Sequence, residues 1–205
     1  MTDEERLTAE NYRRRLREHG ASHLALDWGS REGQRLRFRV LAEVGDLAGR
    51  RILDVGCGLG GFVGWLDERG IAADYTGIDL TADLVARARS LHPGRRFLTG
   101  GILDDVLPAG ERFDYVLASG IFATYAEGAE DYLRRVVARM WSLADIACAF
   151  NSLSAWAPTR EAGEYHADPL ATAAFCRELT PWLVLRHDYH ARDFSFYLYR
   201  QRNAP

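Results

Sequence analysis

Residues 51–61, with the sequence RILDVGCGLGG, constrain the fold of this chain more than any other stretch. The apolar residues of its first half are typical of a buried strand in a parallel sheet. Gly56 and Gly58 allow a tight turn in which the backbone can approach a ligand closely. Residues 62–69 then have the apolar spacing of a helix. A strand, a glycine turn and a helix in this order predict a cofactor bound at the turn.

The charge beside this turn indicates which cofactor binds there. Gly56, Gly58 and Gly61 satisfy the pattern G-x-G-x-x-G, and Asp79 follows at the distance of a ribose-binding acid, so spacing alone leaves a dinucleotide open. Asp54 lies at the end of the same strand. It would repel a pyrophosphate by on the order of 3 kcal/mol, whereas it would attract an ammonium or a sulfonium. A positively charged cofactor is therefore favoured over NAD.

The run LDVGCGLG at 53–60, together with YTGIDL at 75–80, resembles the first two motifs of class I S-adenosylmethionine-dependent methyltransferases. Specific motifs carry the resemblance over residues 51–120, and topology carries it over the rest. It implies S-adenosyl-L-methionine as the cofactor. The cofactor-binding residues it implies are Asp54, Gly56, Cys57, Gly58, Asp79, Leu80, Asp104, Ser119 and Arg37.

Two turns of this chain lack residues that are found in members of the family. Family members commonly place an acid near position 101 to accept a hydrogen bond from the adenine amine, but this chain has Gly101, so Asp104 or a backbone carbonyl would have to make that contact. An Asp104 that never reaches the base is the alternative. Residues 118–122 correspond to the fourth motif and lack the proline-containing signature of enzymes that methylate nucleic-acid nitrogens. This argues against a DNA base as acceptor.

Strands and helices alternate from residue 51 onward, which predicts an α/β fold with a Rossmann-like, doubly wound and mainly parallel seven-stranded sheet. The expected strands are 51–55, 74–78, 95–99, 113–118, 144–150, 182–188 and 194–200. The expected helices are 3–19, 34–44, 60–69, 81–91, 129–141 and 168–178. The last two strands are joined by too few residues for a crossover helix, so we expect a C-terminal antiparallel hairpin.

Residues 1–50 are predicted to form a helical cover over a core at 51–205, within one domain overall. In methyltransferases that resemble this chain, such an N-terminal helical pair folds over the cofactor. Tyr12, Trp28 or Arg37 could then line the lid, and Arg37 could pair with the carboxylate of the cofactor. Ordinary surface packing is the alternative for Trp28 and Arg37.

The candidates for acceptor chemistry lie late in the chain. The loop 153–168 is long and has no periodicity, and loops of this length in compact domains are usually functional. His166 on this loop is the best single candidate for a base, and His190 after the sixth strand is the next, with a structural role as the alternative for each. Glu164, His166 and Asp168 have metal-ligand chemistry but unspecific spacing, so no metal is predicted.

The composition limits the kinds of partner and the location that we expect for this chain. The net charge of −3 offers no electrostatic case for binding nucleic acid, and no apolar stretch has the length of a membrane span. Three widely spaced cysteines in apolar or turn contexts suggest reduced thiols and a cytoplasmic location.

The sequence as a whole predicts an enzyme that transfers a methyl group from S-adenosylmethionine to oxygen or nitrogen of a small-molecule acceptor. We expect a monomer or homodimer without nucleic-acid or membrane partners. A non-catalytic S-adenosylmethionine-binding domain and an NAD-type oxidoreductase are the alternatives.

Overall fold

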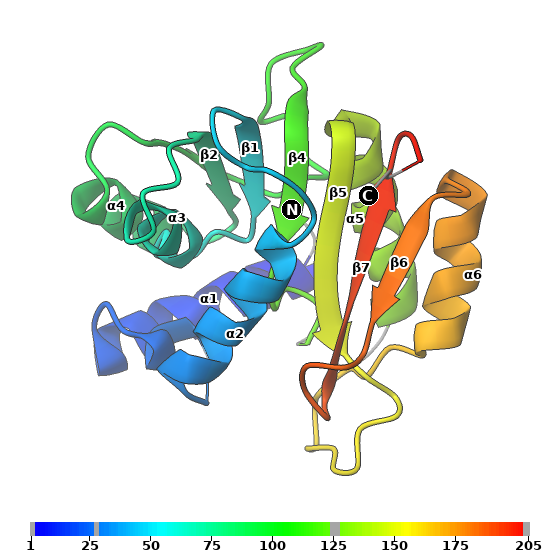
Figure 1. Ribbon diagram of the computed structural model, residues 1–205. Coiled ribbons are helices and arrows are strands. Elements are labelled where there is room, and N and C mark those ends of the chain that lie inside the picture. The colour runs from blue at the N-terminus through cyan, green and yellow to red at the C-terminus, as the bar shows by residue number, and fades with distance from the viewer. Residues whose placement is uncertain (1–2, 27–28, 124–127, 203–205) are drawn as a thin grey trace.

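The computed structural model describes residues 3–26, 29–123 and 128–202. Its strands form one seven-stranded sheet in the order β3-β2-β1-β4-β5-β7-β6, with helices on both faces (Figure 1). Strand β7 is antiparallel to its neighbours β5 and β6, and the other pairs are parallel. The predicted doubly wound sheet and its C-terminal antiparallel hairpin are therefore confirmed.

The strands are β1 Arg51–Val55, β2 Asp74–Asp79, β3 Arg96–Thr99, β4 Phe113–Ala118, β5 Ala144–Leu153, β6 Leu183–Arg186 and β7 Asp193–Tyr199. The helices are α1 Asp3–His19, the 3-10 helix η1 His23–Leu26, α2 Arg31–Ala42, α3 Gly61–Asp67, α4 Ala82–Leu91, α5 Ala129–Leu143 and α6 Pro169–Leu179.

Several elements begin or end a few residues from their predicted bounds, the sixth strand among them, which is shorter at both ends, and two other differences bear on the site. Helix α2 begins three residues earlier than expected, because the Ser30 hydroxyl accepts a hydrogen bond from the Gly33 amide and caps the helix. Strand β5 continues to Leu153 because β7 pairs with it as far as Asp193. The longer β5 carries Asn151 to the edge of the sheet at which the parallel strands end.

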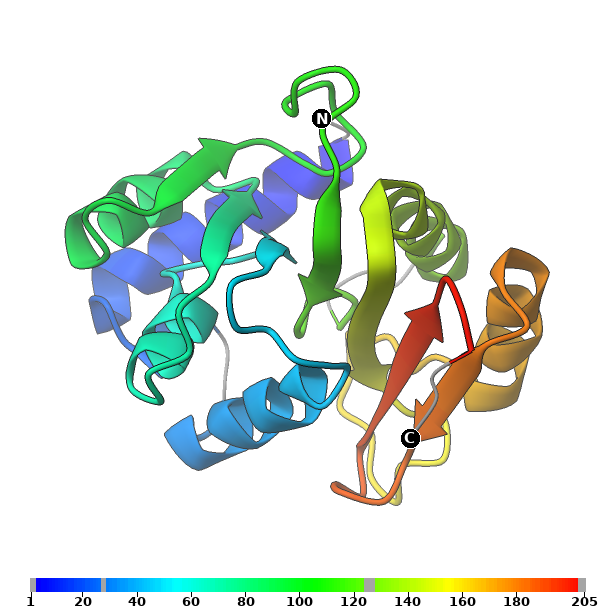
Figure 2. The same cartoon turned by 45° about the horizontal axis from the view of Figure 1, so that its top comes forward.

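The core has two layers, one on each face of the sheet. Along β1, Ile52 belongs to the layer formed with α2, α3 and α4, whereas Leu53 belongs to the layer formed with α5 and α6. Figures 1 and 2 show α2 and α3 in front of the sheet and α5 behind it. The ring of Phe38 in α2 lies 5.5 Å from that of Phe62 in α3. Helix α2 is thus packed into the core. The predicted boundary at residue 50 between a helical cover and the core therefore divides residues that belong to one packed layer.

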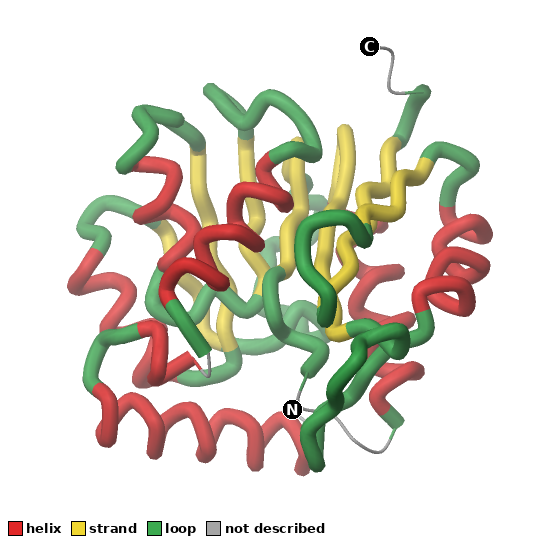
Figure 3. Tube along the Cα trace, turned by 60° about the horizontal axis from the view of Figure 1, so that its bottom comes forward, coloured by secondary structure: helices red, strands yellow, loops and turns green. Residues whose placement is uncertain are grey.

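The parallel strands all end at the lower edge of the sheet in Figure 1. Helix α1 runs across this edge (Figure 3), and the loop after β5 and the turn between β6 and β7 project from it. The strand order reverses between β1 and β4, which is where open α/β sheets bind ligands. Within the described part of the chain, no helix combines the length and apolar character needed to cross a bilayer.

Candidate active site

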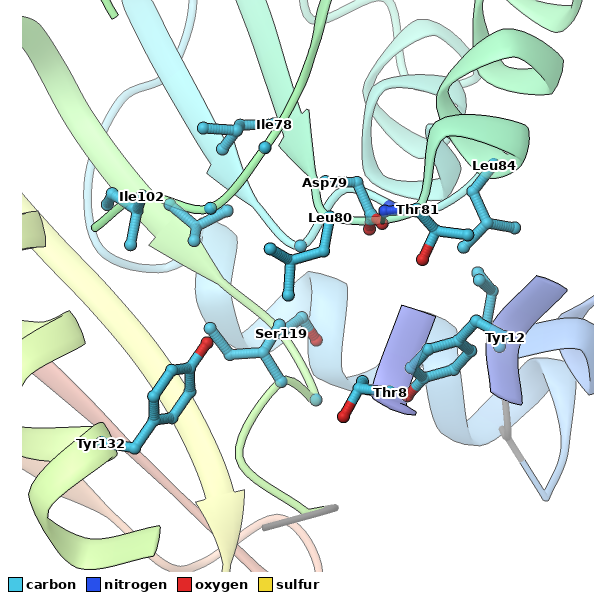
Figure 4. A pocket seen from close by; sticks show the side chains of 18 residues that line it. Thr8, Tyr12, Ile78, Asp79, Leu80, Thr81, Leu84, Ile102, Ser119 and Tyr132 are labelled. Atoms are coloured by element: carbon cyan, nitrogen blue, oxygen red, sulfur yellow. Dashed lines mark hydrogen bonds between the residues drawn. The ribbon is translucent and has the colours of Figure 1, made fainter. Parts of the chain in front are cut away.

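A first cavity, of about 100 Å³, lies beneath the carboxyl ends of β1, β2 and β4. Thr8 and Tyr12 of α1 face the strand-end turns across this cavity (Figure 4), and Leu26 of η1 lines it as well. Five of the predicted cofactor-binding residues line this cavity: Gly56, Gly58, Asp79, Leu80 and Ser119. Residues from three separate strand ends therefore meet where the sequence placed the cofactor.

Asp79 joins two of the turns that form the first cavity. One carboxylate oxygen accepts the Gly58 amide at 2.9 Å, and the other accepts the Thr81 amide at 2.8 Å. Burial raises the pKa of Asp79, and these amide donors offset part of that rise. Each carboxylate oxygen has a second lone pair, so the group can also accept hydrogen bonds from two neighbouring hydroxyls, as in a ribose.

The glycine turn passes close beneath the segments that cover it. Gly56 has a φ of +71° and Gly58 a φ of +53°, which side chains rarely tolerate. A Cβ on Gly56 would lie 2.2 Å from a methyl of Ile121, and a Cβ on Gly58 would lie 2.8 Å from a methyl of Leu26. Both positions therefore require glycine, as the predicted tight turn implies.

Asp54 does not line the first cavity, although the sequence analysis places it among the residues that contact the cofactor. It is buried at the end of β1, and the Tyr75 hydroxyl donates to its carboxylate at 2.6 Å. Burial raises the pKa of Asp54 to about 7, although the hydrogen bond from Tyr75 acts in the opposite direction. Its charge can act on a cation at the glycine turn through the protein interior, without direct contact.

Two further predicted cofactor residues also lie outside the cavity lining. Cys57 is buried, and its sulfur fills the space beside Gly77, where an added Cβ would lie 2.7 Å from it. Burial raises the pKa of this thiol well above its ordinary value, so Cys57 is a packing residue and not a nucleophile. Asp104 accepts the Gly101 amide at 2.9 Å and closes its own turn, while Gly101 lines the cavity.

A second cavity, of about 790 Å³, adjoins the first. Tyr12, Leu26 and Gly120 line both cavities. The second cavity is bounded by α1, α2, the end of β5, the loop 154–168 and the turn 187–192. Its arginine, histidine and acidic lining residues are Arg15, Arg37, Glu161, Glu164, His190, Arg192 and Asp193.

His166, the best predicted candidate for a base, does not line either cavity. Its side chain is 3% exposed, and its two ring nitrogens contact the Ser154 carbonyl at 3.0 Å and the Glu164 carboxylate at 2.9 Å. The ring therefore stabilises the loop through these two contacts, outside the lining of the second cavity. Asp168 instead caps α6 by accepting the Leu170 amide. Within the described ranges, no group of three or more His, Cys, Asp or Glu side chains is placed to hold a metal ion.

The other predicted lid and base residues lie in different places. His190 lines the second cavity, and Tyr12 lines both. Arg37 lies in the second cavity and donates to Asp193 and to the Gly33 carbonyl, so its predicted contact with the cofactor carboxylate stays a prediction. Trp28 lies outside the described residues.

Asn151 is a site residue that motif analysis did not single out. It is buried at the end of β5, where its amide oxygen accepts the Gly120 amide at 2.8 Å and its amide nitrogen donates to the Ser119 hydroxyl at 3.2 Å. It thereby fixes the turn that separates the two cavities. The available signal was a polar residue at the end of an otherwise apolar strand. Thr81, Ile102 and Tyr132 also line the first cavity but carry no motif.

Known proteins resemble this chain in sequence and in fold. Residues 52–142 match the family model described as a methyltransferase domain. A protein of Mycobacterium tuberculosis (strain H37Rv) whose name assigns it to the methyltransferases is 30% identical over 161 residues, which cover 70% of this chain and 89% of that protein.

A trans-aconitate 2-methyltransferase of Rhodopseudomonas palustris is 37% identical over 73 residues, covering 36% of this chain and 28% of that protein. The crystal structure of magnesium protoporphyrin IX methyltransferase from Synechocystis PCC 6803 superposes with a TM-score of 0.67, at 15% identity, over 97% of this chain and 100% of that one. This last likeness shows the fold. With the family match and the relative aligned over most of its length, it establishes that the chain belongs to the class I S-adenosylmethionine-dependent methyltransferases.

Proposed function

We propose that this methyltransferase acts on a small molecule bound in the second cavity and methylates it at oxygen or nitrogen. The observation that carries this proposal is that the second cavity adjoins the first at Tyr12, Leu26 and Gly120. An acceptor in one cavity and a cofactor in the other would meet at this boundary. Methyl transfer depends chiefly on such alignment and on excluding water.

The residues around the first cavity fit S-adenosylmethionine. Asp79 would accept the ribose hydroxyls, and the backbone of Gly56 and Gly58 would allow close approach. Ile78 and Ile102 offer an apolar surface to a purine. When bound, the cofactor supplies a methyl group on a positively charged sulfur, and the buried acid Asp54 favours positive charge at this turn.

The size and lining of the second cavity support a small and polar acceptor. Its volume falls within the roughly 300–1,000 Å³ range of small-molecule sites. The loop 154–168 is held in place at its base, where Ser154 and Ala167 form a β-bridge. The substrates named for the relatives, trans-aconitate and magnesium protoporphyrin IX, are also small molecules.

A titration followed by a screen tests this proposal. Calorimetry should show binding of S-adenosylmethionine, and incubation with hydroxylated and amine metabolites should then form S-adenosylhomocysteine with at least one of them. Methylation of proteins or nucleic acids in place of every small molecule would contradict the proposal. Cofactor binding without turnover on any acceptor would instead favour the non-catalytic binding domain.

Location and assembly remain predictions. Cys57, Cys148 and Cys176 are free and buried, as expected of a protein in the reducing cytoplasm. The sequence-based expectations of a monomer or homodimer and of no nucleic-acid partner can be checked by light scattering and by a binding assay with DNA and RNA.

A further inference from the structure

We infer that Asn151 is a positioning residue that makes the Ser119 hydroxyl a hydrogen-bond donor to the carboxylate at the amino-acid end of the cofactor. This inference rests on the proposed place of S-adenosylmethionine in the first cavity, and it names a contact for the carboxylate of that cofactor. It follows from the two hydrogen bonds of the Asn151 side chain and from the residues that line the first cavity.

The strand register places Asn151 beside Ser119. Ala118, the last residue of β4, pairs with Phe150 of β5 in a parallel ladder. The residues that come next, Ser119 and Asn151, therefore lie side by side. Asn151 is buried, and on its other side it pairs with Ser195 of β7. Its backbone is thus fixed at the edge of the sheet where the parallel strands end.

The backbone amide of Gly120 determines the orientation of the Asn151 side chain. A backbone amide can only donate, so the atom that faces it at 2.8 Å must be the amide oxygen of Asn151. The amide nitrogen then lies 3.2 Å from the Ser119 oxygen, and because this nitrogen can only donate, the Ser119 oxygen must accept. Exchanging the oxygen and nitrogen of Asn151 would set two donors against each other at Gly120.

The Ser119 hydroxyl therefore directs its proton away from Asn151. Ser119 is partly exposed and lines the first cavity, and Figure 4 shows its side chain between those of Tyr132 and Tyr12. Among the described residues, none accepts a hydrogen bond from this hydroxyl. Ser119 thus offers a donor to a ligand in the first cavity.

The strand order indicates which part of the cofactor would reach Ser119. The sheet runs β3-β2-β1-β4, with Asp79 at the end of β2 and Ser119 directly after β4. The second cavity includes the end of β5, on the far side of β4. A ribose on Asp79 and a sulfur facing the second cavity therefore place the amino-acid end of the cofactor toward β4 and its adenine toward β3.

The carboxylate at that end needs hydrogen-bond donors, and the first cavity supplies no charged ones. Among the described residues, no arginine or histidine lines it. Arg37, the predicted partner of this carboxylate, lines the second cavity and donates to Asp193. The ammonium group of the cofactor, by contrast, would be stabilised by the buried acid Asp54 at the end of β1. The hydroxyl proton of Ser119 therefore suits the carboxylate.

Two ligands that differ only in the carboxylate test the inference without an acceptor. The probes are S-adenosylhomocysteine and its decarboxylated analogue, each titrated calorimetrically. Ser119→Ala should weaken the binding of S-adenosylhomocysteine by about 10-fold, as expected for a hydrogen bond to a charged group, and leave the binding of the analogue unchanged. Ser142→Ala, in α5 and outside both cavities, is the matched control and should change neither affinity.

Asn151→Asp tests the positioning role. The new carboxylate can still accept from the Gly120 amide, but it has no proton to donate and would accept the Ser119 proton itself. Binding of S-adenosylhomocysteine should then weaken about as much as in Ser119→Ala. The double variant Ser119→Ala/Asn151→Asp separates this effect from repulsion by the added charge. Asn151→Asp should cause a smaller loss in the Ser119→Ala background than in the native protein.

Three results would overturn the inference alone: native affinity for S-adenosylhomocysteine in Ser119→Ala, an equal loss with both ligands, or an equal effect of Asn151→Asp in both backgrounds. The second is expected if the Ser119 hydroxyl instead accepts from the ammonium group. Thermal unfolding shows whether each variant is folded. If Asn151→Asp is not, Asn151→Ala should weaken S-adenosylhomocysteine more than the analogue. A native protein that binds neither ligand would contradict the proposed function.

Discussion

The two cavities meet at one turn, yet they are built in different ways. The first is formed by consecutive strand-end turns, and its central hydrogen bond joins Gly58 and Asp79, which are 21 residues apart. The second depends on contacts between distant segments, such as that between Arg37 and Asp193, 156 residues apart. The first cavity is thus encoded largely in short motifs, whereas the second requires the assembled sheet.

The two cavities should also differ in the substitutions that they tolerate. In the first cavity, the positive φ of Gly56 and Gly58 and the neighbouring side chains of Ile121 and Leu26 disfavour any side chain at these two positions. The second cavity takes part of its lining from the loop 154–168 and the turn 187–192, and loops are the parts of a fold that vary most easily. Substitutions on the two sides should therefore fail differently.

The largest expected effect is at the glycine turn. Gly58→Val should weaken S-adenosylmethionine binding by about 100-fold, because the valine would strain the left-handed backbone and press on Leu26. Gly94→Val is the control, since Gly94 also has a positive φ but an added Cβ would meet nothing within 4 Å. Calorimetric titration and thermal unfolding of both variants measure the effect. Equal affinities in the two would contradict our account of the turn.

Asp79→Ala should weaken cofactor binding by ~1–3 kcal/mol, because it removes the acceptor for the ribose and for two backbone amides. Asp74→Ala, at the exposed far end of the same strand, should leave the affinity unchanged. The same titration with NAD should show no binding to the native protein. Native affinity in folded Asp79→Ala would remove this residue from the site.

Asp54→Asn tests the buried acid through the pH dependence of stability. The raised folded pKa of Asp54, about 7, penalises the native state once the carboxyl ionises, so this contribution to stability is present in acid and lost as the pH rises through 7. Without cofactor, the variant should exceed the native protein in unfolding free energy by ~1–3 kcal/mol at about pH 8, and the gap should narrow toward pH 5. Denaturant titrations across this pH range measure the effect. If the carboxyl instead stays ionised throughout, the difference in unfolding free energy between the variant and the native protein will be constant.

The smallest effect concerns the loop beside the second cavity. His166→Ala should lower the unfolding free energy by ~1–2 kcal/mol, because Glu164 and the Ser154 carbonyl lose a buried partner. Turnover of the folded variant should stay near that of the native enzyme. A large loss of kcat without loss of stability would return His166 to the acceptor pocket and show that the loop moves during the reaction.

The sequence by itself determined the sheet, the glycine turn and the place of Asp79 at the end of the neighbouring strand. These follow from short-range rules, because apolar period, glycine conformation and connection length act within a few residues of each other. The terminal hairpin is the clearest case, since the few residues between β6 and β7 exclude a crossover helix.

Only the tertiary structure decided which neighbouring side chains face the cavities. Asp54 and Cys57 flank the glycine turn in sequence, but they point into the core layer beneath it. His166 lies in the long loop 154–168 but does not line the second cavity, whereas His190 does.

The pairing of Arg37 with Asp193 was likewise beyond the sequence. It depends on α2 packing against one face of the sheet and on β7 lying beside β5 within that sheet. No local pattern encodes a contact between two chain segments that far apart, because their approach is set by strand order and helix packing.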